Sequence, residues 1–172
     1  MKRISLTLFV TLFTMVSFAG GIKVSQGKVS YIKNEGTVAV VFNWENAKWD
    51  MGTSVKEEWG DNYQSYVDNG ESEFIEGFNK SCKKVKMVKD ESSANYIMTV
   101  EFTNFDKFYS VMSLVPGNKH KIWAEITVTD KDSGEIICKY NVNEFKGGRD
   151  FSIFDSYKEA MRDFGYELAR IK

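Results

Sequence analysis

Three consecutive segments in the second half of the chain alternate apolar and polar residues, and this alternation constrains the fold more than any other feature. The first segment, residues 96–105, sets four apolar side chains against three polar ones: Tyr96, Met98, Val100 and Phe102 against Thr99, Glu101 and Thr103. Residues 121–129 and 135–145 repeat the pattern. Because successive side chains of a strand point to opposite faces, each segment has one apolar and one wettable face. The pattern predicts a three-strand antiparallel meander that is covered on one side only.

The end of the chain supplies a cover for the apolar face. Ser152 with Asp155 and Ser156 with Glu159 both match a helix-capping pattern. Apolar residues then recur at three- and four-residue spacing: Tyr157, Met161, Phe164, Leu168 and Ile171. This spacing predicts an amphipathic helix that docks on the meander.

The first half of the chain adds strands and a second helical region. Residues 37–44 form a near-continuous apolar run, which is typical of a central strand buried on both faces. Short strands are expected at 22–24, 28–32 and 85–88. Between Ser54 and Lys83 apolar residues follow a helical spacing, so we expect one helix or two helices broken near Asn69-Gly70. The predicted fold class is α+β: a single mixed, largely antiparallel sheet that ends in a three-strand meander, with helices packed mainly on one face.

Residues 1–19 have the features of a secretory signal peptide. Lys2 and Arg3 precede an uncharged stretch, and the small residues Ser17 and Ala19 stand before the expected cleavage point. The apolar stretch is too short to favour a transmembrane anchor, so we expect a mature chain without a membrane span, exported to the periplasm or outside the cell. Residues 20–172 then form a single globular envelope domain.

Charge argues against a nucleic-acid partner. Removal of Lys2 and Arg3 leaves 21 basic residues against 24 acidic residues, a net charge of −3, whereas nucleic-acid binding calls for a concentrated basic surface. One local exception is a run of five lysines in ten residues: Lys80, Lys83, Lys84, Lys86 and Lys89. Such a run could attract an anionic polymer or a lipid headgroup, but we favour a solvated helix end followed by an edge strand that lysines protect.

The residues needed for catalysis are scarce, and we expect a protein that is not an enzyme. The single histidine, His120, lies between two lysines at the start of a strand, where we expect it on the surface. One histidine and two distant cysteines do not make a usual zinc ligand set, so neither a metal nor a cofactor is expected. Residues 130–135 are read as a tight turn, since they lack the spacing of a calcium loop.

Cys82 and Cys138 enter an oxidising compartment if the chain is exported. Cys82 falls on the apolar stripe of the first helical region, and Cys138 falls on the helix-facing side of a meander strand. Both residues therefore point into one interface. A disulfide between them and two reduced, buried thiols both fit this arrangement.

Two aromatic or apolar segments are candidates for binding. The connection between the first two meander strands, residues 105–117, is apolar where a hairpin tip normally faces water, so it either packs over the core edge or contacts a partner. The partner-binding candidates there are Phe105, Phe108, Tyr109, Met112 and Leu114. In the other segment, Trp44, Trp49 and Trp59 are interleaved with acidic residues, which could stack against and hydrogen bond to a sugar or another small ligand. Aromatic residues that anchor a long loop explain the same pattern.

Two short motifs resemble features of exported bacterial domains. The run Ser93 to Val100 is similar to an Ala-Asp-Tyr-like entry to a central strand, with Asn95 in place of the acidic residue, and Asp130 with Ser133-Gly134 resembles an Asp-x-x-(Ser/Thr)-Gly hairpin. Such motifs are common in a broad group that includes the curli secretion-channel subunit, the amino-terminal domain of the Tol-system β-propeller protein and lipoproteins that activate peptidoglycan synthases. The resemblance implies an interaction module of the cell envelope without an active site. The chain lacks the lipidation cysteine of the lipoprotein members.

Together these observations predict a non-enzymatic exported domain that binds a protein or an envelope component. The alternative is a small-ligand or glycan-binding protein that uses the tryptophan-rich segment 44–59.

Overall fold

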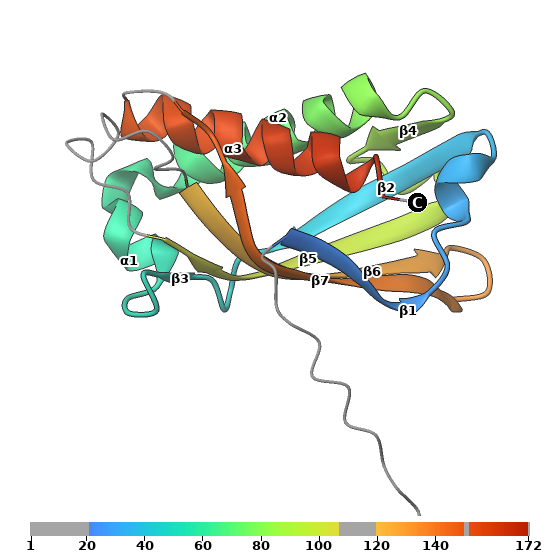
Figure 1. Ribbon diagram of the computed structural model, residues 1–172, viewed down its shortest axis with the longest axis horizontal. Helices are drawn as coiled ribbons and strands as arrows, with labels where there is room; N and C mark the ends of the chain where they lie inside the picture. The colour runs from blue at the N-terminus through green and yellow to red at the C-terminus, as the bar shows by residue number, and fades with distance from the viewer. Residues whose placement is uncertain (1–20, 107–119, 150–151, 172) are drawn as a thin grey trace, which may run out of the picture.

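The computed structural model describes residues 21–106, 120–149 and 152–171, and it contains one seven-stranded sheet with two long helices on one face (Figure 1). The strands are β1 (Gly21–Gly27), β2 (Gly36–Asn43), β3 (Lys48–Trp49), β4 (Val85–Val88), β5 (Tyr96–Phe105), β6 (His120–Asp130) and β7 (Ile136–Gly147). The helices are α1 (Val55–Trp59), α2 (Tyr63–Ser81) and α3 (Ile153–Leu168), with short 3₁₀ turns at Tyr31–Lys33 and Gly60–Asn62.

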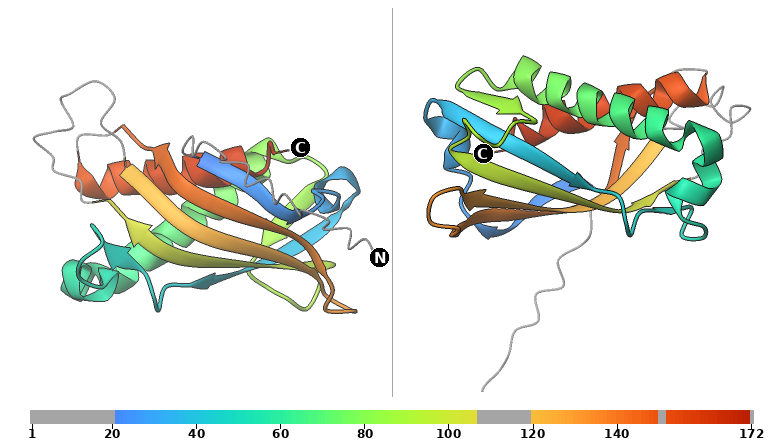
Figure 2. Two further views of the ribbon diagram at one scale, coloured as in Figure 1. Left: turned by 60° about the horizontal axis from the view of Figure 1, so that its bottom comes forward. Right: turned by 180° about the vertical axis from the view of Figure 1, so that it is seen from behind.

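The strands lie in the order β1-β7-β6-β5-β2-β4. The pairs β1–β7, β7–β6 and β6–β5 are antiparallel. By contrast, β2 pairs parallel with both β4 and β5, and the two-residue β3 pairs parallel with the end of β5. The α+β class, the mixed sheet, the terminal meander and the one-sided helices are confirmed. In Figure 2 the left view brings the sheet forward, and the right view shows α2 and α3 together on its other face.

Two local expectations are corrected. Residues 28–32 are not a strand, because the chain leaves β1 and turns through the 3₁₀ segment Tyr31–Lys33. The helical region does break, but at Gly60–Asn62 rather than near Asn69-Gly70, and α2 runs through Gly70 without interruption. Gly70 lies on the buried side of α2 against the ring of Tyr157, so packing between the helices keeps this turn helical.

The two long helices touch through their backbones. A Cβ atom on Gly77 of α2 would overlap the carbonyl of Arg162, and one on Gly165 of α3 would overlap the carbonyl of Phe74. Both glycines therefore allow an approach that any larger residue would prevent. The contact also brings Phe74 against Phe164, with ring centroids 5.1 Å apart.

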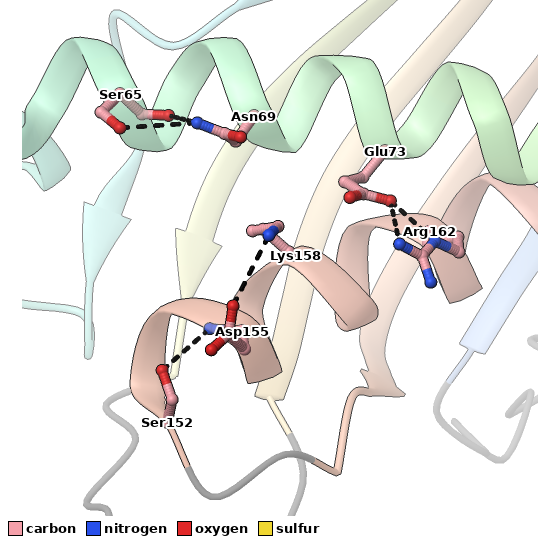
Figure 3. Close-up of polar contacts among 7 residues, drawn as sticks. All are labelled: Ser65, Asn69, Glu73, Ser152, Asp155, Lys158 and Arg162. Carbon is pink, nitrogen blue, oxygen red and sulfur yellow. Dashed lines mark hydrogen bonds and ion pairs between the residues drawn. The ribbon is translucent and has the colours of Figure 1, made fainter.

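Polar contacts fix the same pair of helices. Figure 3 shows Arg162 of α3 pointing toward Glu73 of α2, where Nη2 and Nε lie 2.6 and 2.7 Å from one carboxylate oxygen. At the start of α3, the Ser152 hydroxyl accepts a hydrogen bond from the Asp155 amide at 3.2 Å. Of the two caps that the sequence offered, the one at Ser152 is thus confirmed, whereas Ser156 lies within α3.

The core lies between the helices and the sheet. Met98, Val100 and Phe102 of β5 and the matching residues of β6 and β7 are buried beneath α2 and α3, as the alternation predicted. The opposite face is polar, with exposed Glu101 and Asn141 among its side chains. Among the described residues, no helix is both long and apolar enough to span a lipid bilayer.

The two cysteines are free thiols, so the disulfide considered from the sequence is not formed. Cys138 is buried on the helix-facing side of β7, as expected, and Cys82 is half-buried at the end of α2. Near Cys138, the hydroxyls of Tyr31 and Tyr140 lie 3.2 Å apart, and burial raises the pKa of both far above the ordinary value for tyrosine. Both hydroxyls are therefore uncharged at neutral pH.

We predict that Gly165→Ala lowers the free energy of unfolding by about 1–3 kcal/mol, because the added methyl group forces the helix backbones apart. Chemical denaturation monitored by circular dichroism measures this change. Gly52→Ala is the matched control: a Cβ there would meet its nearest neighbour at 3.5 Å, so its effect should be small. Equal effects of the two substitutions would contradict a backbone contact at Gly165.

Candidate functional site

The strand ladders on both sides of Trp123 are irregular. On one side, β5 carries the extra residue Thr103 between the pairs Phe102–Ala124 and Asn104–Trp123. On the other side, Asn143 and Glu144 of β7 both lie opposite Trp123. Such β-bulges bend a strand and re-aim side chains, and they are frequent next to functional sites. We call the group Met51, Asn104, Trp123, Asn143 and Glu144 the bulged end of the sheet.

Backbone strain gathers at the same place. Among the described residues, three non-glycine residues have φ in the left-handed region, namely Asp50 at 51°, Met51 at 56° and Glu144 at 52°. This conformation costs Met51 and Glu144 about 1–2 kcal/mol relative to ordinary backbone, whereas aspartate adopts it more readily. Such strain persists only where the surroundings enforce it, and it clusters at binding and catalytic sites. The bulged end is therefore the strongest candidate site in the described part of the chain.

The Asp50-Met51 turn is held by the end of β5. The Asp50 amide donates to the Phe105 carbonyl at 2.7 Å, and the Met51 amide donates to Oδ1 of Asn104 at 2.8 Å. Asn104 is buried, yet the Met51 side chain is 67% exposed. The turn thus presents a large apolar side chain to water beside Asn104, which is itself the pairing partner of Trp123.

Trp123 is fixed on the face of the sheet that α2 and α3 leave open. Its neighbours Ile122 and Ala124 are buried toward the helices, so the half-buried indole points the other way. Nε1 of the indole donates a hydrogen bond to Oδ1 of Asn143 at 2.9 Å. This bond orients the ring and leaves part of it accessible.

A chain of ion pairs borders the site. Lys121 Nζ lies 3.1 Å from Asp106 and 3.1 Å from Glu144, and Lys146 lies 3.2 Å from the same Glu144 oxygen. Hydrogen bonds to Asp106 and Glu144 raise the pKa of Lys121, and hydrogen bonds from Lys121 and Lys146 lower the pKa of Glu144. These pairs are partly exposed, so they contribute little stability. They do hold together the ends of β5, β6 and β7.

A layer of aromatic rings supports the site from below. Trp44 stacks on Phe105 with centroids 5.6 Å apart, Trp49 packs on Trp59 at 5.8 Å, and Trp59 stacks on Tyr66 at 4.8 Å. The three tryptophans are only 8%, 5% and 7% exposed, and their rings face other rings. This corrects their interpretation as a surface for a sugar or small ligand, since stacking on a sugar needs an open ring face. They anchor the segment 44–59 on the core.

Phe105 is also corrected. The sequence placed it in a partner-binding surface, but it is fully buried at the end of β5, opposite Ile122. The other candidates of that segment, Phe108, Tyr109, Met112 and Leu114, lie outside the described residues. Residues 107–119 connect the end of β5 to the start of β6, and both strand ends belong to the region of the bulged end.

The sequence suggested that His120 lies on the surface, but the structure shows that it is buried. It is 1% exposed, and its ring lies 6.4 Å from that of Trp49 and 6.3 Å from that of Tyr157. Burial lowers the pKa of His120 to about 4, although the Ile153 backbone and the charge of Asp106 act in the opposite direction. The flanking lysines misled the sequence interpretation, because the strand turns His120 inward while Lys121 faces out.

The bulged end has the chemistry of a contact surface. It offers an exposed thioether, an oriented indole, amide groups and paired charges. In the described ranges, no three histidine, cysteine, aspartate or glutamate side chains are grouped so that they could hold a metal ion. Sequence patterns missed Met51, Trp123 and Glu144, because an Asp-Met pair is not a usual left-handed turn sequence and strand alternation carries no sign of a bulge.

We predict that His120 makes stability depend on pH. Between pH 6.5 and 4 this ring is protonated in the unfolded chain but neutral in the folded chain. The free energy of unfolding therefore keeps its full value above pH 6.5 and falls by up to about 3 kcal/mol as the pH drops to 4. Denaturation of the protein and of His120→Gln from pH 7.5 to 4 should give curves of stability against pH that converge toward low pH. Parallel curves would contradict a lowered pKa.

Comparisons with known proteins give similarity in fold alone. No protein-family model matches the chain, and no curated protein matches it. A PelC dodecamer from Paraburkholderia phytofirmans has a similar fold, with a TM-score of 0.51, 9% identity, 89% of this chain and 99% of that chain covered. A homolog of a neuraminyllactose-binding hemagglutinin from Helicobacter pylori aligns at 0.39 with 12% identity, covering 85% and 87%. Both of these structures are of bacterial proteins, but neither is named as a member of the three groups that the sequence motifs resemble. A relation to those three groups therefore stays a prediction.

Proposed function

We propose that the chain is a non-enzymatic, exported domain that binds a protein or another component of the bacterial envelope through the bulged end of its sheet. The observation that carries the proposal is the gathering of all three described left-handed, non-glycine residues around Trp123. Backbone strain of this kind lowers stability. Contacts of Met51 and Trp123 with a binding partner would explain why it is retained.

The exposed groups suit a binding partner. Met51 is flexible and apolar, Trp123 is held in place by Asn143, and the charges of Asp106, Lys121, Glu144 and Lys146 surround them. A central apolar anchor with a polar rim is the usual anatomy of a protein interface. The apolar residues predicted from sequence between β5 and β6 (Phe108, Tyr109, Met112 and Leu114) would enlarge this surface.

The similar fold of PelC, a protein whose structure is a dodecamer, supports a role in association, because a scaffold of this type is able to present surfaces for contact. The signal-peptide features of residues 1–19 support export. The burial of the single histidine, His120, among aromatic rings supports a role without catalysis, since its ring is not open to a substrate.

We predict that Met51→Gly weakens binding while it leaves the fold as stable or stabilises it by about 0.5–1 kcal/mol. Glycine adopts a positive φ without strain, but it removes the exposed thioether. The tagged mature protein and the variant would be used for affinity capture from the native envelope, and thermal unfolding would be measured in parallel. Capture of the same component at equal yield by both proteins would overturn a role for Met51.

A matched control separates a local surface from general stickiness. Ile136 is 41% exposed at the start of β7, at the opposite end of the strand from Glu144. Ile136→Thr removes an exposed apolar group of similar kind and should leave capture unchanged. Loss of capture in both variants would show that the binding does not depend on the bulged end.

We further predict that changing Phe108, Tyr109, Met112 and Leu114 together to serine abolishes capture and leaves the melting temperature within about 2 °C. This outcome is expected if these side chains contact a partner instead of covering the core. A large fall in melting temperature would support the alternative in which the segment packs over the core edge.

A further inference from the structure

The run of five lysines is concentrated at one edge of the sheet. Lys80 lies in the last turn of α2, Lys83 and Lys84 lie in the connection to β4, and Lys86 and Lys89 lie on or next to β4. In Figure 1, β4 is the edge strand beside the end of α2, far from α1 and the bulged end. The run contains no acidic residue, although the mature chain is net negative.

Most of this charge is not neutralised within the fold. Among the described residues, only Lys89 of the five has a carboxylate partner, Glu71 at 2.8 Å. Lys84 Nζ donates to the backbone carbonyl of Lys33 at 2.9 Å, which positions its charge without cancelling it. Lys80, Lys83, Lys84 and Lys86 are all exposed. The edge therefore carries an uncompensated positive potential.

A pocket lies within this group. It has a volume of about 320 Å³ and is lined by Asn79, Cys82, Lys83, Lys84, Val85 and Lys86. Its frame is fixed on two sides, because the Cys82 amide donates to Phe78 at 2.8 Å and the Gly36 amide donates to the Lys84 carbonyl at 3.3 Å. The size is at the lower end of pockets that hold small ligands.

Two ordinary structural roles of lysine account for only some of the five lysines. Cations near the end of a helix stabilise its dipole, but one lysine in the last turn of α2 meets that need. Lysines also protect edge strands, yet the outer edge of β4 is already blocked at Met87. There, the Asn79 side chain donates to the Met87 carbonyl at 2.9 Å and accepts from its amide at 2.7 Å.

We propose that this pocket binds a phosphate group, carried by a small molecule or by a lipid headgroup. Three lysines that line one pocket supply the charge, and lysine binds phosphate as a mobile point charge with three donors. The Asn79 amide is committed to Met87, so the lysines make the contacts. The site is separate from the bulged end, and the proposal does not depend on the proposed function.

The test uses the mature chain with inorganic pyrophosphate, followed by isothermal titration and by amide NMR shifts. We expect saturable binding at 50 mM salt, shifts concentrated in residues 79–87, and weaker binding at higher salt. The variant Lys83→Gln, Lys84→Gln, Lys86→Gln should bind at least tenfold more weakly. The control Lys48→Gln, Lys56→Gln, Lys131→Gln has the same change in net charge elsewhere, and it should bind within twofold of the unaltered chain.

Vesicles identify the source of the phosphate. Binding to vesicles that contain phosphatidylglycerol, but not to phosphatidylcholine alone, together with loss in the first variant, would assign a headgroup. Binding of pyrophosphate without binding to either vesicle would assign a soluble ligand. Binding of neither probe, or equal losses in the two triple variants, would overturn the proposal.

Discussion

The backbone contact between α2 and α3 is the constraint on which the rest of the structure depends. Gly77 and Gly165 let the helices touch, so the pair forms one compact layer that covers the apolar face of the strands. Phe74, Phe78 and Phe164 are then fully buried between the helices and the sheet. A wider separation would open space beneath the helices, and lost packing in a core costs several kcal/mol.

Because both long helices lie on one face, the other face of the sheet stays in contact with water. It can therefore be polar, and it can carry an oriented indole at Trp123 without disturbing the core. The aromatic layer formed by Trp44, Trp49 and Trp59 fixes the end of the sheet from the covered side. The strained turn and the bulges sit on a rigid base, which is the condition for holding a contact surface in one shape.

The sequence allowed the meander, the central strand and the terminal helix to be predicted, because period-two and helical spacing are local signals that burial reinforces. It misplaced His120, whose lysine neighbours suggested a surface position, and the tryptophans, whose acidic neighbours suggested a ligand. The helical spacing of the last segment also gives no sign that Gly165 makes the contact between the two helices. The positive φ angles of Met51 and Glu144 could not be predicted from the sequence, because methionine and glutamate seldom adopt this backbone conformation.

The two proposed sites lie in different parts of the molecule and differ in their balance of charge. The bulged end balances two lysines against Asp106 and Glu144, so its potential is nearly neutral and apolar contact must supply most of its binding energy. The β4 edge has four exposed lysines without a described carboxylate partner, so attraction there is electrostatic and depends on salt. Because strand β2 lies between β4 and the meander, a ligand at one site leaves the other free. One chain could then hold an anionic component at its edge while a partner binds at the end of the sheet.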